Sequence, residues 1–176
     1  MRARRTWRKL HLAVDADTGM VMASTLTEND MGDPSQVAPL LDQVNAEIGS
    51  VTADGAYDGA PTYDTIAARA GNIPVIIPPH VTAVLSATAA HHPSQRDQHI
   101  TVMAARGRIG WQEDTGYGQR SLVETAMGRY KTIIGPGLRA RSLPGQRTEA
   151  AVGVAVLNRM LHAGRPNSVR RTRVAS

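Results

Sequence analysis

The chain has 176 residues, no cysteine and a formal net charge of +5. This length allows one domain with a hydrophobic core, and the lack of cysteine excludes disulfide frameworks, thiolate nucleophiles and thiolate metal sites. No apolar run is long enough to cross a bilayer, so we expect a cytoplasmic protein with no membrane partner. The basic charge favours a polyanionic partner such as nucleic acid, and the scarcity of aromatic residues argues against base stacking.

A hairpin is predicted at the start of the chain. Residues 6–14 and 20–26 both have the composition and loose alternation of strands. Between them, Asp15-Ala16-Asp17-Thr18-Gly19 has the composition of a tight turn, and Gly19 can take the positive φ that such turns need. An EF-hand-like calcium loop is not favoured, because no glutamate follows at the required distance.

The next segment predicts alternating helices and strands. Asp33 before Pro34 indicates an N-cap followed by proline at the first helical position. Apolar residues at helical spacing then predict a helix to Ile48 that ends at Gly49. The further elements predicted are a short strand over 50–54, a helix over 61–70 and a buried strand over 73–77. This alternation indicates an α/β layer.

The later part of the chain is less regular. From His80 to about Ile100 the composition predicts an exposed connection. His91 and His92 could ligate a metal there, but no third ligand is suitably spaced, and a solvated loop is favoured. Residues 146–163 suit a final amphipathic helix, and the basic tail over 164–176 is expected to be disordered.

One stretch, Tyr117–Lys131, combines charges in an unusual way. No proline interrupts it, and it is predicted to be one helix. At ~100° per residue, Tyr117, Arg120, Glu124 and Lys131 fall within an arc of roughly 60°. Such a face needs partners or ligands if it lies beside a core, and it could bind a phosphate and a metal together. The alternative is a solvated face on which Arg120 and Glu124 form an ordinary helical ion pair.

A second candidate residue, Asp54, lies where a predicted strand ends and Gly55 begins a turn. Ligands bind at this edge in open α/β sheets, and the Asp54 carboxylate could meet Glu124 there. Carboxylates at one spot repel each other unless a divalent cation holds them, and oxygen ligands select Mg²⁺ or Mn²⁺. Two such ions about 4 Å apart can promote attack at a phosphodiester. The alternative is that Asp54 is a turn residue, and Asp58 and Asp64 are interpreted as turn and cap residues.

These residues resemble the motifs of a known family. Ala53-Asp54-Gly55-Ala56-Tyr57-Asp58 resembles the second-aspartate motif of the DDE transposases of bacterial insertion sequences. The series Tyr117, Arg120, Glu124, Lys131 matches the Tyr-x2-Arg-x3-Glu-x6-Lys signature of that superfamily. Residues 7–15 and the polar loop ending at Asp33 also resemble its core, so that the resemblance covers roughly residues 5–161.

The resemblance implies an RNase H-like α/β fold, a mixed sheet flanked by helices. It also implies DNA transposition and recombination through a metal-dependent reaction. Asp54 and Glu124 would be the second and third acidic ligands of two Mg²⁺ or Mn²⁺ ions. Tyr117, Arg120 and Lys131 would position DNA. Hydrolysis at the transposon end would expose a 3′-hydroxyl that attacks target DNA, with no covalent protein intermediate.

The family's first aspartate lies on a strand upstream of the basic segment with which this sequence opens. We therefore expect residues 1–163 to be an N-terminally truncated catalytic domain without the first strand or its ligand. Asp15 and Asp17 match the hairpin after the second strand, not this ligand. Such a chain would be inactive, or active only after combination with an upstream reading-frame product. Its expected protein partners are that product or further copies in a homo-oligomer. The alternatives are a non-catalytic DNA-binding remnant and a metal-dependent nuclease on the same fold.

Overall fold

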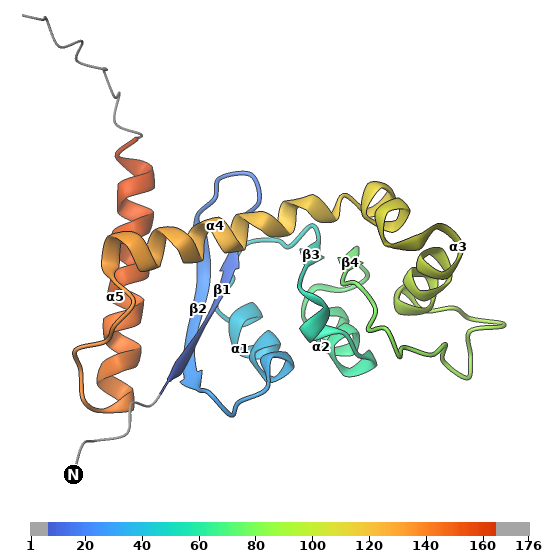
Figure 1. Ribbon diagram of the computed structural model, residues 1–176, viewed down its shortest axis with the longest axis horizontal. Helices are drawn as coiled ribbons and strands as arrows, with labels where there is room; N and C mark the ends of the chain where they lie inside the picture. The colour runs from blue at the N-terminus through green and yellow to red at the C-terminus, as the bar shows by residue number, and fades with distance from the viewer. Residues whose placement is uncertain (1–6, 165–176) are drawn as a thin grey trace, which may run out of the picture.

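The computed structural model describes residues 7–164, which form a mixed α/β fold, as predicted (Figure 1). The elements in chain order are β1 (Arg8–Val14), β2 (Val21–Glu28), a 3₁₀-helix (Asp33–Gln36), α1 (Val37–Leu41), β3 (Val51–Thr52), a 3₁₀-helix (Gly55–Tyr57), α2 (Ala60–Ala70), β4 (Val75–Ile76), α3 (Gln95–Thr115), a 3₁₀-helix (Tyr117–Arg120), α4 (Ser121–Arg129), a π-helix (Tyr130–Ile134) and α5 (Leu143–His162). The prediction for the tail falls, apart from Gly164, outside the described residues. Within 7–164, no helix has the length and apolar character needed to cross a membrane.

The predicted hairpin is confirmed, with β1 and β2 paired antiparallel. Its turn forms as its composition indicates. The Asp15 carboxylate accepts hydrogen bonds from the backbone N–H groups of Asp17 and Thr18 at 2.8 and 2.9 Å, and Gly19 has a φ of 71°. Asp15 therefore has a local structural role that the turn alone explains.

A second strand pair, β3 and β4, is parallel and connected through α2. Both strands are shorter than predicted. Pro74 and Pro78 closely flank β4 and lack the N–H groups that would extend the ladder, which limits its length. The pairs β1–β2 and β3–β4 share no strand-to-strand hydrogen bonds within residues 7–164.

The predicted helix from Asp33 to Ile48 is wrong in its extent. A 3₁₀-helix precedes α1, because Pro39 lacks the N–H that would continue regular α-helical bonding to residue 35. Asp33 is not the N-cap, since Gly32 occupies that position and the Asp33 carboxylate accepts a hydrogen bond from Lys9 Nζ at 3.1 Å. The apolar spacing still predicted burial correctly, because Ile48 packs against the core from a non-helical segment.

The outer edge of β2 is covered by side chains from helices and the segment after α1. Asn158 of α5 accepts a hydrogen bond from Val21 N–H at 2.9 Å and donates one to its carbonyl at 2.8 Å, as a neighbouring strand would. Ser24 N–H donates to the Gln43 side chain at 3.2 Å. These bonds satisfy backbone groups that would otherwise be open to pairing.

The outer edge of β4 is covered in the same way by α3. Gln95 accepts a hydrogen bond from Val75 N–H at 2.9 Å and donates one to the Ile73 carbonyl at 2.8 Å. His99 Nε2 lies 2.8 Å from the Val75 carbonyl oxygen. Both strand pairs are thus closed on their outer sides by helix side chains.

The inner edges, on β1 and β3, have no such cover within the described residues. Leu12 is opposite Ser24, whose N–H points outward, so the backbone groups of Leu12 also point away from β2. Val51 and Ala53 donate to the β4 side, so Thr52 presents its backbone groups to the opposite side. Figure 1 shows β1 and β3 as the strands of each pair nearest the other pair.

Two larger apolar cores pack against these strand pairs, and a smaller cluster of Ala23, Leu40 and Val44 joins β2 to α1 and the segment after it. One core joins β1, β2, α4 and α5, and its buried members are Leu12, Val21, Ala126, Tyr130, Val154 and Leu157. The other joins α1, α2, β3 and β4, and its buried members are Val37, Leu41, Ile66, Val75 and Ile77. The 3₁₀-helix Tyr117–Arg120 contacts β3 while α4 contacts β1, so this continuous segment spans both halves (Figure 1).

The final helix predicted over 146–163 is confirmed, although α5 begins earlier, at Leu143. It approaches the π-helix closely at Gly153. A Cβ at this position would lie 2.8 Å from Tyr130 Cε2 and 3.0 Å from Ile134 Cγ2. Because Tyr130 is itself buried, the absence of a side chain at 153 sets the distance between the two helices.

We predict that Gly153→Ala destabilises the fold by about 1–3 kcal/mol, since overpacking at the Tyr130 ring outweighs the gain in helix propensity. Gly128→Ala in α4 is the matched control, because nothing lies within 4 Å of a Cβ there. The control should stabilise the protein by up to about 1 kcal/mol. Urea unfolding of both variants measures the difference, and equal effects would contradict the packing argument.

Candidate active site

The segment Tyr117–Lys131 is not one helix, contrary to the prediction. It consists of a 3₁₀-helix, then α4, and then the first two residues of a π-helix. Gly116, with a left-handed φ of 67°, ends α3 and turns the chain immediately before Tyr117. The tighter 3₁₀ turn and the wider π turn depart from the uniform ~100° step on which the prediction of a single charged stripe rested.

Tyr117 is buried, and its ring packs against Trp111 with a centroid distance of 5.1 Å. Trp111 is fully buried and donates its indole N–H to His99 Nδ1 at 3.0 Å. Because the indole can only donate, His99 must carry its proton on Nε2 and donate it to the Val75 carbonyl. A continuous chain of contacts therefore connects the edge of β4 to Tyr117, which precedes Arg120.

Asp54 and Glu124 come together on one guanidinium. Asp54 follows β3 as the N-cap of the 3₁₀-helix Gly55–Tyr57, and its Oδ1 accepts a hydrogen bond from Ala56 N–H at 3.2 Å. Arg120 Nη2 donates to Asp54 Oδ2, and Arg120 Nη1 lies 2.8 Å from Glu124 Oε1. The helical ion pair that the sequence left open is present, and the structure extends it to the end of β3.

The two carboxylates of the site are exposed to solvent, and the charge of Arg120 partly neutralises theirs. The side chains of Asp54 and Glu124 are 48% and 62% exposed, whereas Arg120 is 31% exposed. Partial burial of Asp54 would raise its pKa. Its hydrogen bonds from Ala56 and Arg120 outweigh this, so the pKa lies below its ordinary value. Burial is also the main reason that the pKa of Tyr117 is raised, so this phenol stays neutral at pH 7.

An open pocket of about 400 Å³ adjoins the guanidinium, lined in part by Gln112, Tyr117, Gly118, Arg120 and Ser121. Lys131 lies on the π-helix, exposed, and forms no ion pair with any residue in the described range. Of the four signature residues, the structure thus joins Arg120 to Glu124 directly, places Tyr117 in the packing behind them, and leaves Lys131 at the surface.

A comparison with protein families now adds to this geometry. The chain matches the family model described as Transposase DDE domain over residues 2–161. The chain belongs to this transposase family. The match includes Asp54 and the whole segment from Tyr117 to Lys131, and the family resemblance seen in the sequence is confirmed. No solved structure matches the chain.

The DDE family implies a divalent metal, and the donor types in this domain suit one. Asp54 and Glu124 supply carboxylate oxygens, which Mg²⁺ and Mn²⁺ prefer, and both already bind one cationic group. No cluster of three or more His, Cys, Asp or Glu side chains that could hold a metal occurs between residues 7 and 164. Within residues 7–164, Asp54 and Glu124 therefore form a carboxylate pair with no third such side chain beside them.

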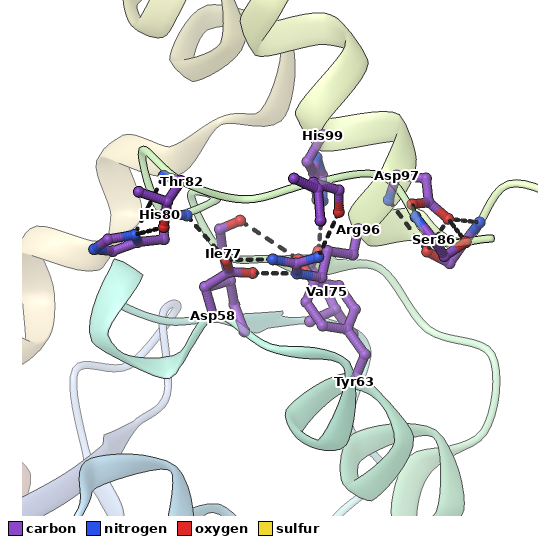
Figure 2. Close-up of polar contacts among 12 residues, drawn as sticks. Asp58, Tyr63, Val75, Ile77, His80, Thr82, Ser86, Arg96, Asp97 and His99 are labelled. Carbon is purple, nitrogen blue, oxygen red and sulfur yellow. Dashed lines mark hydrogen bonds and ion pairs between the residues drawn. The ribbon is translucent and has the colours of Figure 1, made fainter. Parts of the chain in front are cut away.

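The turn that carries Asp54 is anchored by a buried ion pair that the sequence did not reveal (Figure 2). Asp58 ends this turn, and its carboxylate accepts hydrogen bonds from Arg96 Nε and Nη2 at 2.7 and 2.9 Å and from His80 N–H at 2.9 Å. The Asp58 side chain is only 2% exposed. Burial alone would raise the pKa of Asp58, but the hydrogen bonds from Arg96 and His80 lower it below its ordinary value.

The prediction of an exposed connection up to Ile100 is wrong for its last residues, since α3 begins at Gln95. Ser94 and Asp97 form a reciprocal capping box at its start, and Asp97 also accepts hydrogen bonds from the Ser86 N–H and hydroxyl (Figure 2). The serine followed by an acid three residues later was the available signal. The periodicity of α3 is weak because Gly107, with a φ of 69°, interrupts it.

We predict that Asp58→Asn destabilises the DDE domain by about 2–4 kcal/mol at pH 7, because Arg96 loses its charged partner. The Asp58 contribution is complete above the ordinary aspartate pKa of about 3.9 and disappears as the pH falls through the lower folded-state pKa. The difference between wild type and variant should therefore shrink below about pH 4.

Unfolding of both proteins in urea between pH 7 and pH 3 measures this difference. Asp64→Asn, at an exposed position on α2, is the control and should change stability by less than about 0.5 kcal/mol. A difference that stays constant with pH would contradict the assignment of a charged Asp58.

Proposed function

We propose that this DDE domain takes part in transposition by metal-dependent cleavage and transfer of DNA strands at insertion-sequence ends. The observation that carries the proposal is the convergence of Asp54 and Glu124 on one guanidinium at an exposed surface. These two side chains come from a strand end and a helix that are far apart in the sequence. The family match supports their assignment to a shared DNA-processing site.

The proposed roles follow from the chemistry of each side chain. Asp54 and Glu124 would hold Mg²⁺ or Mn²⁺, which when bound supplies electrophilic stabilisation of a phosphodiester undergoing in-line attack. Arg120 and Lys131 would bind backbone phosphates, as arginine does through two donors and lysine through one compact charge. Tyr117, which lines the adjoining pocket, would orient Arg120 through its packing on Trp111.

We further propose that a third acidic ligand arrives on an extended segment that pairs between β1 and β3. Both outer edges of the strand pairs are covered by side chains, whereas the backbone groups of Leu12 and Thr52 on the inner edges are not bonded by residues 7–164. Asp54 lies just beyond β3, beside this open edge. The segment would come from an upstream reading-frame product.

We expect the DNA upstream of the Met1 codon, translated in all three frames, to encode such a segment with a central aspartate. A segment in the same frame would indicate one longer enzyme, and a segment in another frame would indicate frameshifting or a two-piece enzyme. The lack of any such segment would contradict the proposal.

A second candidate function is DNA binding without catalysis. It is favoured by the charge balance at the site, because Arg120 already pairs with both carboxylates and no third ligand joins them among residues 7–164. This function requires salt-sensitive binding that does not depend on metal. A metal-dependent nuclease on the same fold would cut DNA without joining it, so a joining assay separates it from a transposase.

We predict that Glu124→Gln and Asp54→Asn each lower Mg²⁺-dependent nicking and joining of transposon-end DNA by more than about 100-fold. Even outer-shell partners of a metal are worth 10–100-fold. Glu47→Gln and Asp64→Asn, both at exposed positions, are the matched controls and should retain activity. The assay uses the full chain, alone and with any upstream product.

Activity that survives Glu124→Gln would exclude this active-site assignment. Cutting without joining, lost in the same variants, would favour the nuclease. DNA binding with no cutting in any combination, and with the same affinity in EDTA and Mg²⁺, would favour the non-catalytic function.

A further inference from the structure

Arg120 occupies the position between the two carboxylates that a metal would need. One of its terminal nitrogens bonds Asp54 Oδ2, and the other lies 2.8 Å from Glu124 Oε1. The guanidinium thus contributes positive charge and hydrogen bonds to one oxygen of each carboxylate. Because Asp54 Oδ1 already accepts a hydrogen bond from Ala56 N–H, a divalent cation at Asp54 would compete with Arg120 for Oδ2.

Arg120 competes strongly with a divalent cation for the carboxylates of Asp54 and Glu124. Hydrogen bonds between a guanidinium and a carboxylate are roughly twice as strong as those between neutral groups. A hexahydrated Mg²⁺ is also reluctant to lose water, and two carboxylates alone are a small ligand set for it. Metal binding to Asp54 and Glu124 therefore has to displace bonds that Arg120 already makes.

The pocket beside Arg120 has space for a different partner of its guanidinium. Its side chain is 31% exposed and lines the open pocket of about 400 Å³ together with Tyr117 and Ser121. A phosphate in this pocket would meet an arginine whose planar donors suit two phosphate oxygens. Such a phosphate would compete with Asp54 and Glu124 for the same N–H groups.

We propose that Arg120 is an exchangeable clasp, which holds Asp54 and Glu124 together until a DNA phosphate binds its guanidinium and leaves the carboxylates to a divalent metal. This inference rests on the proposed function and adds a coupling to it. DNA and metal would bind cooperatively, and by thermodynamic linkage each would raise the affinity for the other by the same factor. The site would have little affinity for metal before DNA is present.

The first test measures binding of Mn²⁺ alone to the full chain, from the electron paramagnetic resonance signal of free Mn²⁺. We expect Arg120→Gln to bind Mn²⁺ at least about tenfold more tightly than wild type, since it frees both carboxylates from charge-assisted bonds. Arg120→Lys keeps the charge but cannot bridge in the same way, and should fall between the two.

Arg106→Gln is the matched control for the loss of one positive charge. Arg106 pairs with Asp114 near the end of α3, so it makes a similar ion pair that involves neither site carboxylate. This control should stay within about twofold of wild type, because an exposed charge away from the site is largely screened by salt. Circular dichroism and thermal unfolding confirm that each variant is folded.

The possible results separate the clasp from the proposed function. Equal Mn²⁺ affinity in wild type and Arg120→Gln, with weaker binding in Asp54→Asn, would overturn the clasp and leave the metal site intact. Similar tightening in Arg106→Gln and Arg120→Gln would also overturn it, because the effect would then be one of net charge. Absence of Asp54-dependent Mn²⁺ binding in Arg120→Gln as well as in wild type would overturn both the clasp and the metal-dependent function.

The second test adds a short DNA duplex as the phosphate source. Under the proposal, the duplex tightens Mn²⁺ binding to wild type, and Mn²⁺ tightens duplex binding by the same factor. Neither effect should occur in Arg120→Gln, in which the carboxylates are already free. A duplex that raises Mn²⁺ affinity equally in wild type and Arg120→Gln would overturn the coupling through Arg120.

Discussion

The position of the candidate site depends on how the segment from Tyr117 to Ile134 is fixed at its two ends. At one end, Tyr117 packs on Trp111, which reaches the β4 edge through His99. At the other end, Tyr130 lies against Gly153 of α5. Between these contacts the chain has little freedom, because the side chains of Trp111, Tyr117 and Tyr130 are all buried. The buried contacts at the two ends of the segment therefore place Arg120 and Glu124 beside Asp54. The ion pairs among these three residues contribute only part of this positioning.

The electrostatics of the site follow from this placement. Exposed ion pairs contribute little stability, so the contacts of Arg120 with Asp54 and Glu124 are not needed to hold the fold. The buried pair of Asp58 and Arg96 is different, because it fixes the turn that follows Asp54 and would be costly to break. The buried pair is thus a rigid support for the exposed charges of Asp54, Arg120 and Glu124. This arrangement is expected where a ligand replaces contacts within the protein.

Local chemistry explains which features were predictable from the sequence. The hairpin turn at Asp15–Gly19, the helix ended by Gly71 and the long C-terminal helix each depend on neighbouring residues, and they formed as predicted. Asp54 and Glu124 were found from their motifs, whereas their shared contact with Arg120 needed the fold. The pairs Asp58–Arg96 and His99–Trp111 join residues whose spacing carries no signal. These contacts exist only because α3 packs against β4 in the folded protein, so the sequence alone did not predict them.

The π-helix at Tyr130–Ile134 determines in which direction the side chains of the preceding helix α4 point. A π turn accommodates one more residue than an α turn. Because Tyr130 and Ile134 are held against α5, loss of that residue would leave the anchored end in place and rotate everything before it by about 100°. Glu124 would then face a different direction from Asp54. The wide turn therefore sets the rotation of α4, on which both the packing of Ala126 in the core and the direction of Glu124 depend.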